Sequence, residues 1–216
     1  MKKYELTTDT KVIFGKKYFR IRALVDFGTV LKGDLGGYIE SEDNLPNDTK
    51  YGEAWVGGNA RVGGNARVDG EAYVGGFAYV GGEAHVGGEA WVGDRAHVGG
   101  EAHVGGEARV WDNTWISGKA HIGGNAHIEG NAYVEGDARI NGEACYTTIK
   151  GFGTEFRNTT FFRCKDNKIR VRCGCFYGDI DEFRKQVKRT RDGKIAKEYL
   201  MIADLMEYHF GREDDM

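Results

Sequence analysis

One six-residue unit repeats through residues 52–144 without gaining or losing a residue. Every sixth position from Val56 to Ile140 is valine or isoleucine, fifteen times out of fifteen. Alanine stands two positions before each of these aliphatic residues, and glycine stands two positions before each alanine. The exceptions are Thr114 among the alanines and Asp94 and Asp112 among the glycines. A fixed short period of this kind is typical of a solenoid built from stacked units.

Each unit, such as residues 56–61, reads as one short strand and one corner. Because successive side chains of a strand face opposite sides, Ala60 and Val62 are expected inside and Arg61 outside. The two glycines after the valine suit a sharp corner with positive φ. Three units close one coil, so residue n stacks on residue n+18 at about 4.8 Å. The prediction is an all-β solenoid, a parallel β-helix of a little over five coils, and its unbroken register favours the left-handed form.

The residues before the repeat follow a different pattern. Residues 3–31 alternate in the manner of strands and predict a hairpin around Gly15, followed by a first irregular coil over residues 34–39. An open coil end exposes unpaired backbone groups that favour aggregation, so a solenoid needs a cover there. We therefore assign residues 1–50 to an N-terminal β cap and residues 51–146 to the repeat, with Pro46 near the junction.

After Ala144 the period stops, and residues 147–216 predict a small α+β module. Residues 156–164 and 169–176 read as two strands joined by a turn. Asp179 or Asp181 is expected to cap a first helix, and a second helix covers roughly residues 195–210. The predicted order of this module is β-β-α-α.

Composition narrows the class of function. The net charge is −3, from 30 basic and 33 acidic residues, so no basic field predicts a nucleic-acid partner. The first residues lack the apolar core of a signal peptide, and no apolar run reaches membrane-spanning length. Four cysteines, three of them within residues 164–175, fit a reduced, cytoplasmic protein better than a disulfide scaffold. We expect a cytoplasmic protein without a membrane partner.

The repeat resembles the hexapeptide-repeat, left-handed β-helix superfamily across residues 52–146. Three features also look like proteins encoded by phages and prophages of Gram-positive bacteria. They are residues 20–24 (Arg-Ile-Arg-Ala-Leu) with 33–42 (Gly-Asp-Leu-Gly-Gly-Tyr-Ile-Glu-Ser-Glu), the Gly-Asn-Ala-Arg-Val style of unit, and residues 173–183 (Cys-Gly-Cys-Phe-Tyr-Gly-Asp-Ile-Asp-Glu-Phe). The resemblance implies a viral context, and the superfamily's usual assembly implies a homo-oligomer, with a trimer favoured. Related proteins are called transferases through fold alone, which is an analogy.

Catalysis and metal binding are the less favoured alternatives. Acyltransferases of this superfamily use a loop that projects from the coil, whereas no insertion interrupts the repeat here. Cys164, Cys173 and Cys175 could supply thiolates to zinc, yet their Cys-x-Cys spacing on a strand differs from the usual Cys-x₂₋₄-Cys. Pairing Cys164 with Ile169 would place Cys173 opposite Thr160. We expect no catalytic residue, no cofactor and no metal.

The outward strand position carries the strongest functional signal. Its occupants include no acidic residue and no threonine or valine, although exposed strands usually contain the latter two. Tryptophan, tyrosine, arginine and histidine dominate instead, which is the composition of protein interfaces. The predicted binding residues fall into three columns at intervals of 18: Trp55, Tyr73 and Trp91; Tyr79, His97 and Trp115; and Arg67, His85, His103, His121 and Arg139. The corners carry mainly carboxylates and asparagines, which we interpret as solubilising edges.

The column of three histidines allows a sharper hypothesis. His85, His103 and His121 are expected on neighbouring rungs, close enough to share a metal ion. Two flanking arginines disfavour a bound cation, and no carboxylate is expected there to complete a metal shell. An anionic or aromatic partner fits the column better.

Together these features predict a non-enzymatic phage accessory protein that binds a macromolecular partner, such as a host or defence protein, through flat faces. The alternatives are a hexapeptide-type acyltransferase and a sponge for a small anionic ligand or nucleotide.

Overall fold

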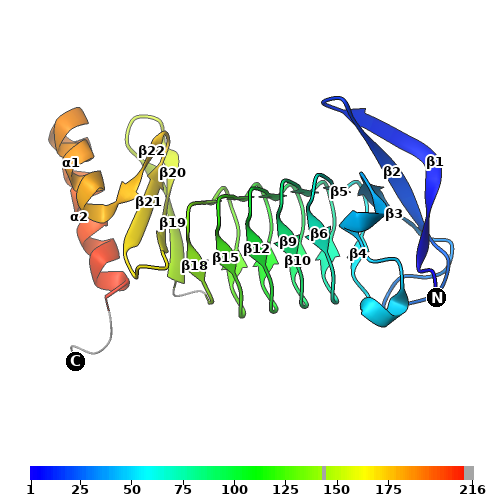
Figure 1. Ribbon diagram of the computed structural model, residues 1–216. Coiled ribbons are helices and arrows are strands. Elements are labelled where there is room, and N and C mark those ends of the chain that lie inside the picture. The colour runs from blue at the N-terminus through cyan, green and yellow to red at the C-terminus, as the bar shows by residue number, and fades with distance from the viewer. Residues whose placement is uncertain (143–144, 212–216) are drawn as a thin grey trace.

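The computed structural model describes residues 1–142 and 145–211. Glu143 and Ala144, which the repeat assigns to its last unit, lie outside these residues. A cap of strands, a straight solenoid and a small α+β region follow one another along a single axis (Figure 1). The N-terminal strands and the C-terminal helices lie at opposite ends of this axis.

The solenoid is parallel, as the period predicts. Each repeat contributes one two-residue strand, and each strand pairs in parallel with the strand 18 residues later. Stacking produces three faces of five rungs each. The strands are β4 (Trp55–Val56), β5 (Arg61–Val62), β6 (Arg67–Val68), β7 (Tyr73–Val74), β8 (Tyr79–Val80), β9 (His85–Val86), β10 (Trp91–Val92), β11 (His97–Val98), β12 (His103–Val104), β13 (Arg109–Val110), β14 (Trp115–Ile116), β15 (His121–Ile122), β16 (His127–Ile128), β17 (Tyr133–Val134) and β18 (Arg139–Ile140).

The interior is filled as the repeat predicts. From Val56 to Ile140 each sixth aliphatic side chain is buried, and so are the alanines two positions before them. Thr114, the one exception among the alanines, is also buried. Its hydroxyl donates a 2.6 Å hydrogen bond to the carbonyl of Trp111, which removes the cost of an unpaired polar group in the core.

Where a unit has two glycines at its corner, the two have different roles. Only the second has positive φ, as at Gly58 (60°), whereas Gly57 does not. Asp94 (51°) and Asp112 (58°) take this left-handed conformation where the glycine is missing, which a short polar side chain tolerates better than most. The first glycine provides space instead: a Cβ at Gly75 would overlap with the ring of Tyr73. The prediction of positive φ was therefore right for one glycine of each pair.

The N-terminal cap is built on the predicted hairpin. β1 (Tyr4–Ile13) and β2 (Lys16–Ala23) pair antiparallel, and the turn at Phe14 and Gly15 joins them. β3 (Leu35–Ile39) pairs antiparallel with β2 and in parallel with β5, so the cap sheet continues one face of the solenoid. Two 3-10 turns, η1 (Glu42–Asn44) and η2 (Thr49–Tyr51), complete the transition.

The backbone ladder of the solenoid has one direction. The N–H groups of each rung donate to carbonyls of the following coil, for example Trp55 to Ala72. The carbonyls of the first coil consequently have no earlier rung to pair with, and the cap supplies a different donor on each face. The Lys3 ammonium donates to Ala54, the Asn44 amide donates to Ala66, and the backbone of β3 pairs with β5.

The C-terminal region is richer in strands than the sequence indicated. β19 (Tyr146–Phe152), β20 (Arg157–Arg163), β21 (Ile169–Cys173) and β22 (Phe176–Asp179) form one antiparallel sheet, followed by α1 (Ile180–Thr190) and α2 (Gly193–His209). The predicted order β-β-α-α was therefore wrong: β19 was not predicted, and the second predicted strand, residues 169–176, covers β21 and the start of β22. Asp179 caps α1 as expected, accepting from the backbone N–H of Glu182.

The two helices pack on this small sheet through a core separate from that of the solenoid, formed by Phe161, Val171, Phe183, Tyr199 and Met206 among others. Neither helix in the described residues has the length and apolar character needed to cross a membrane.

Candidate functional site

The outward strand residues form three regular columns, because consecutive rungs pair in exact n+18 register. We name these surfaces by their columns. Face 1 carries Trp55, Tyr73, Trp91, Arg109 and His127; face 2 carries Arg61, Tyr79, His97, Trp115 and Tyr133; face 3 carries Arg67, His85, His103, His121 and Arg139. Each predicted binding residue thus lies in the column that the 18-residue interval assigned to it.

Face 2 holds a continuous stack of rings. His97 and Trp115 are nearly parallel, with ring centroids 3.8 Å apart and an angle of 9°. Tyr79 packs beneath His97 at 5.0 Å, and Tyr133 lies above Trp115 at 6.2 Å. Burial, followed by the charge of Arg61, lowers the pKa of His97, so the stacked imidazole is mainly neutral at pH 7. The stack holds Trp115 in place while leaving 41 % of its surface exposed.

Guanidinium groups flank the stack at both ends. Arg61 lies over the ring of Tyr79 at 5.6 Å, and Arg172 of β21 lies over Tyr133 at 5.8 Å. Arg172 also forms a 3.1 Å ion pair with Glu135 at a solenoid corner. The C-terminal sheet therefore contributes to the edge of face 2, a contact that the repeat does not predict because Arg172 lies outside it.

Face 3 brings the predicted histidines together and adds a carboxylate. Asp69 accepts from His85 Nε2 at 2.9 Å and pairs with Arg67 Nε at 3.0 Å. The Nδ1 atoms of His85 and His103 are 3.0 Å apart. If His85 donates its Nε2 proton to Asp69, its Nδ1 accepts from His103, which fixes the tautomers of both rings.

The expectation that no carboxylate reaches face 3 was wrong. Asp69 directly follows Val68 at a corner position where most repeats have glycine, and this departure was the available signal. Burial, followed by the charges of His85 and His121, lowers the pKa of His103, while Asp69 acts in the opposite direction. The described residues contain no cluster of three or more side chains positioned to hold a metal ion.

Face 1 differs from the prediction at its first rung. Trp55 is only 5 % exposed, because Phe27 and Tyr4 of the cap pack against its indole at 5.4 Å and 6.4 Å. Trp55 is therefore a core residue, and its assignment to the exposed binding surface is corrected. Tyr73 and Trp91 remain at the surface, in a T-shaped contact with centroids 5.0 Å apart.

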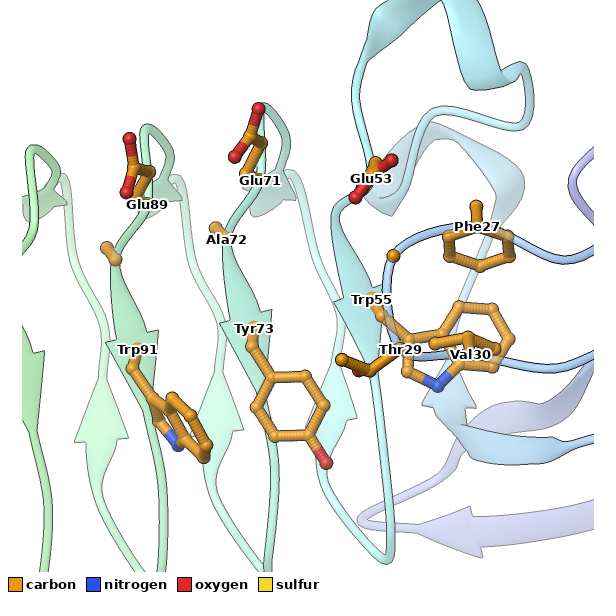
Figure 2. Close-up of a pocket in the computed structure, with 12 residues that line it drawn as sticks. Phe27, Thr29, Val30, Glu53, Trp55, Glu71, Ala72, Tyr73, Glu89 and Trp91 are labelled. Carbon is orange, nitrogen blue, oxygen red and sulfur yellow. The ribbon is translucent and has the colours of Figure 1, made fainter.

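A groove runs beside face 1, where the cap loop at residues 27–30 overhangs the first rungs (Figure 2). Its volume is about 400 Å³. Glu53, Glu71 and Glu89 follow one another along the corner that precedes the strands, whereas the rings of Tyr73 and Trp91 point away from them, toward the corner that holds Gly75 and Gly93.

The four cysteines have different environments. Burial, followed by a hydrogen bond to Asp137, raises the pKa of Cys164 to about 12, so this thiol remains protonated. Cys173 pairs with Thr159, not with Thr160 as predicted, and accepts a hydrogen bond from its hydroxyl at 3.2 Å. Cys175 is exposed and Cys145 is half-buried.

Comparison with protein-family models finds no match for this chain. A comparison with curated proteins likewise finds no match.

Proposed function

We propose that this chain is a non-enzymatic binding protein that holds a protein partner on the flat faces of its solenoid. In this proposal it is a left-handed hexapeptide-repeat protein of phage or prophage origin that acts in the cytoplasm of the bacterial host, where it occupies a host or defence protein. The resemblance of residues 20–24, 33–42 and 173–183 to phage proteins supports the viral context. A homotrimer would use one face for self-association.

The observation that carries the proposal is the ring stack of face 2. Trp115 and Tyr133 are 41 % and 43 % exposed, and stacking already restricts their motion. Aromatic side chains that are ordered before binding lose little entropy in a complex, which is a property of interface anchors. The stack also lies on regular strands, which fix its geometry more firmly than a loop would.

Face 3 supplies a second polar surface next to the first. Its five outward side chains are arginines and histidines, and one of the arginines, Arg67, is already paired with Asp69. We expect the partner to present acceptor groups or aromatic rings to this column.

Affinity capture from host lysate with tagged protein, followed by a binding measurement with the captured partner, tests the proposal. We expect Trp115→Ala or His103→Glu to weaken binding by more than about 1–2 kcal/mol, the scale of a lost interface anchor. Both side chains point outward, so circular dichroism should show an unchanged fold. Cys173→Ser is the control and should bind as the wild type does. Binding lost with Cys173→Ser and retained by both face variants would move the function to the C-terminal region.

A further inference from the structure

Face 3 contains two imidazole nitrogens that approach each other closely. His85 and His103 occupy consecutive rungs, and their Nδ1 atoms are 3.0 Å apart. A hydrogen bond accounts for this distance when one ring donates and the other accepts. The same distance also suits two ligands of one metal ion, because histidine nitrogens bind zinc and similar divalent ions at about 2.0–2.1 Å.

The distance between the two nitrogens favours one coordination geometry. Two atoms 3.0 Å apart that each lie about 2.0–2.1 Å from one ion subtend an angle of about 90–97° at that ion. Neighbouring ligands of square-planar and octahedral complexes have an angle close to this, whereas tetrahedral zinc requires a wider one. Cu²⁺ and Ni²⁺ prefer tetragonal sets of nitrogen and oxygen ligands. The pair therefore fits an ion of this class better than it fits zinc.

Asp69 makes the outer contact that metal-binding histidines usually have. A ligating histidine typically donates its second N–H to a carboxylate, which fixes the ring and makes the other nitrogen a stronger ligand. Asp69 accepts from His85 Nε2 at 2.9 Å, which leaves His85 Nδ1 as the free nitrogen. Glycine at position 87 provides the space, since a Cβ there would lie 2.8 Å from Asp69 Oδ1. This carboxylate is independent of the distance between the two rings, and it too points to a bound cation.

The charges around the pair are more favourable to a cation than the sequence indicated. Arg67, one of the two flanking arginines, is already paired with Asp69 at 3.0 Å. The other, Arg139, lies two rungs beyond His103, or about 10 Å, where salt screens much of its charge. The side chain of His85 is 37 % exposed, so an ion can reach the pair from solvent.

We propose that His85 Nδ1 and His103 Nδ1 together bind one divalent ion of the Ni²⁺ or Cu²⁺ class, with Asp69 orienting His85 and water completing the coordination. The ion takes the place of the proton that the two nitrogens otherwise share. A small outward turn of both rings directs their lone pairs at the ion, and His103 then carries its proton on Nε2. His121 lies outside the site, because its ring centroid is 5.6 Å from that of His103, against 4.6 Å between His85 and His103. This site goes beyond the proposed function, which requires no metal.

Isothermal titration calorimetry of the full, untagged chain with nickel chloride tests the proposal. We expect one nickel ion per chain, and binding at least tenfold weaker in His85→Gln and in His103→Gln, because each variant keeps a single imidazole. Asp69→Asn should weaken binding about tenfold, as the loss of an outer contact to a metal ligand does. The matched control is His127→Gln, which removes an outward imidazole whose neighbour on face 1 is Arg109, and it should retain wild-type affinity. Cys175→Ser, which removes an exposed thiol, should also bind as the wild type does.

Thermal unfolding gives a second readout, since a ligand that binds the folded chain stabilises it. Excess Ni²⁺ should raise the unfolding midpoint of the wild type and of His127→Gln, and should leave that of His85→Gln nearly unchanged. Absence of nickel binding to the wild type would overturn the proposal, and so would equal affinities of His85→Gln, His103→Gln and the control. Binding lost in His121→Gln and kept in His85→Gln would place the ion on another pair of rungs and would also overturn it.

Two further measurements separate this site from other effects. Circular dichroism of each variant distinguishes loss of the site from loss of the fold. Trp115→Ala should bind nickel as the wild type does, although we expect it to weaken partner capture. Failure of the metal site and failure of the proposed function can therefore be told apart.

Discussion

Lys3 Nζ donates a 2.9 Å hydrogen bond to the carbonyl oxygen of Ala54, and the Lys3 side chain is fully buried. A buried lysine is unusual. Here its ammonium occupies the place of an earlier rung, since it also lies 3.5 Å from the carbonyl of Gly52. One flexible side chain thus completes the end of a sheet that has no further strand on that side.

Replacing Lys3 with methionine should destabilise the cap. Methionine has a similar length but cannot donate, so two carbonyls lose their partner at a cost of about 1–3 kcal/mol. Thermal unfolding monitored by circular dichroism should show a lower midpoint. Lys2→Met is the matched control, because Lys2 is exposed and forms only a surface ion pair with Glu42. Equal midpoints for the two variants would contradict the role given to Lys3.

The same lysine predicts a dependence of stability on alkaline pH. Burial lowers the pKa of Lys3 from 10.5 to about 8, with Glu53 acting in the opposite direction. Between these values the unfolded chain holds a proton that the folded chain has released. The free energy of unfolding should therefore rise with pH from about 8 to 10.5, relative to Lys3→Met, which lacks the group. Parallel denaturation curves of both proteins across this range provide the measurement; identical pH slopes would exclude the shift.

A charge placed inside a coil should unfold several rungs. Val98 has 0 % exposure and is surrounded by alanine and aliphatic side chains, so Val98→Asp buries a carboxylate without a partner. Arg95→Asp, at an exposed corner of the same coil, is the control and should unfold close to the wild-type temperature. If Val98→Asp melts within a degree or two of wild type, the assignment of the core is wrong.

Replacing a corner glycine that has positive φ with alanine should destabilise the solenoid. Gly100 has φ of 65°, and an added Cβ would lie 2.8 Å from the backbone nitrogen of Gly118. Gly100→Ala should therefore cost about 1–2 kcal/mol or more through conformational strain alone. Asp94→Gly supplies the opposite change at an equivalent corner and should be neutral or stabilising. Chemical denaturation of both variants measures the difference, and a Gly100→Ala protein as stable as wild type would refute the strain.

We further expect the protein to be a homotrimer in solution. Exposed Trp91, Trp115 and Tyr133 leave aromatic surface on two faces, which self-association would cover. Light scattering at micromolar concentration should return three times the 23.9 kDa mass of the chain. A mass of one chain would remove this prediction.

The core of the solenoid could be predicted because it depends on local periodicity alone. Val98 and Ala102 are buried for a reason visible within a few residues of sequence: an inward position recurs every six residues. The n+18 columns follow from the same period, so the contact between His97 and Trp115 could be predicted because these residues are 18 positions apart.

Residues at the two ends could not be assigned in this way. Trp55 has the outward position of its repeat, yet it is buried by Phe27, which lies outside the repeat and has no periodic relation to it. The capping roles of Lys3 and Asn44 depend on how the chain folds back onto the first coil. The only sequence signal for Asp69 was that it replaces the glycine found at this position in most repeats. The six-residue period does not predict that its carboxylate turns toward His85.

The single direction of the ladder makes the two ends of the solenoid chemically unlike. Bare carbonyls would face outward at the first coil and bare N–H groups at the last, where the Thr160 hydroxyl now accepts from Tyr133. Two coils without their covers would continue each other's hydrogen bonding head to tail, and nothing in that contact would limit the number of copies. The terminal regions thus determine where the molecule stops, and without them the same repeat is a building block for a fibre.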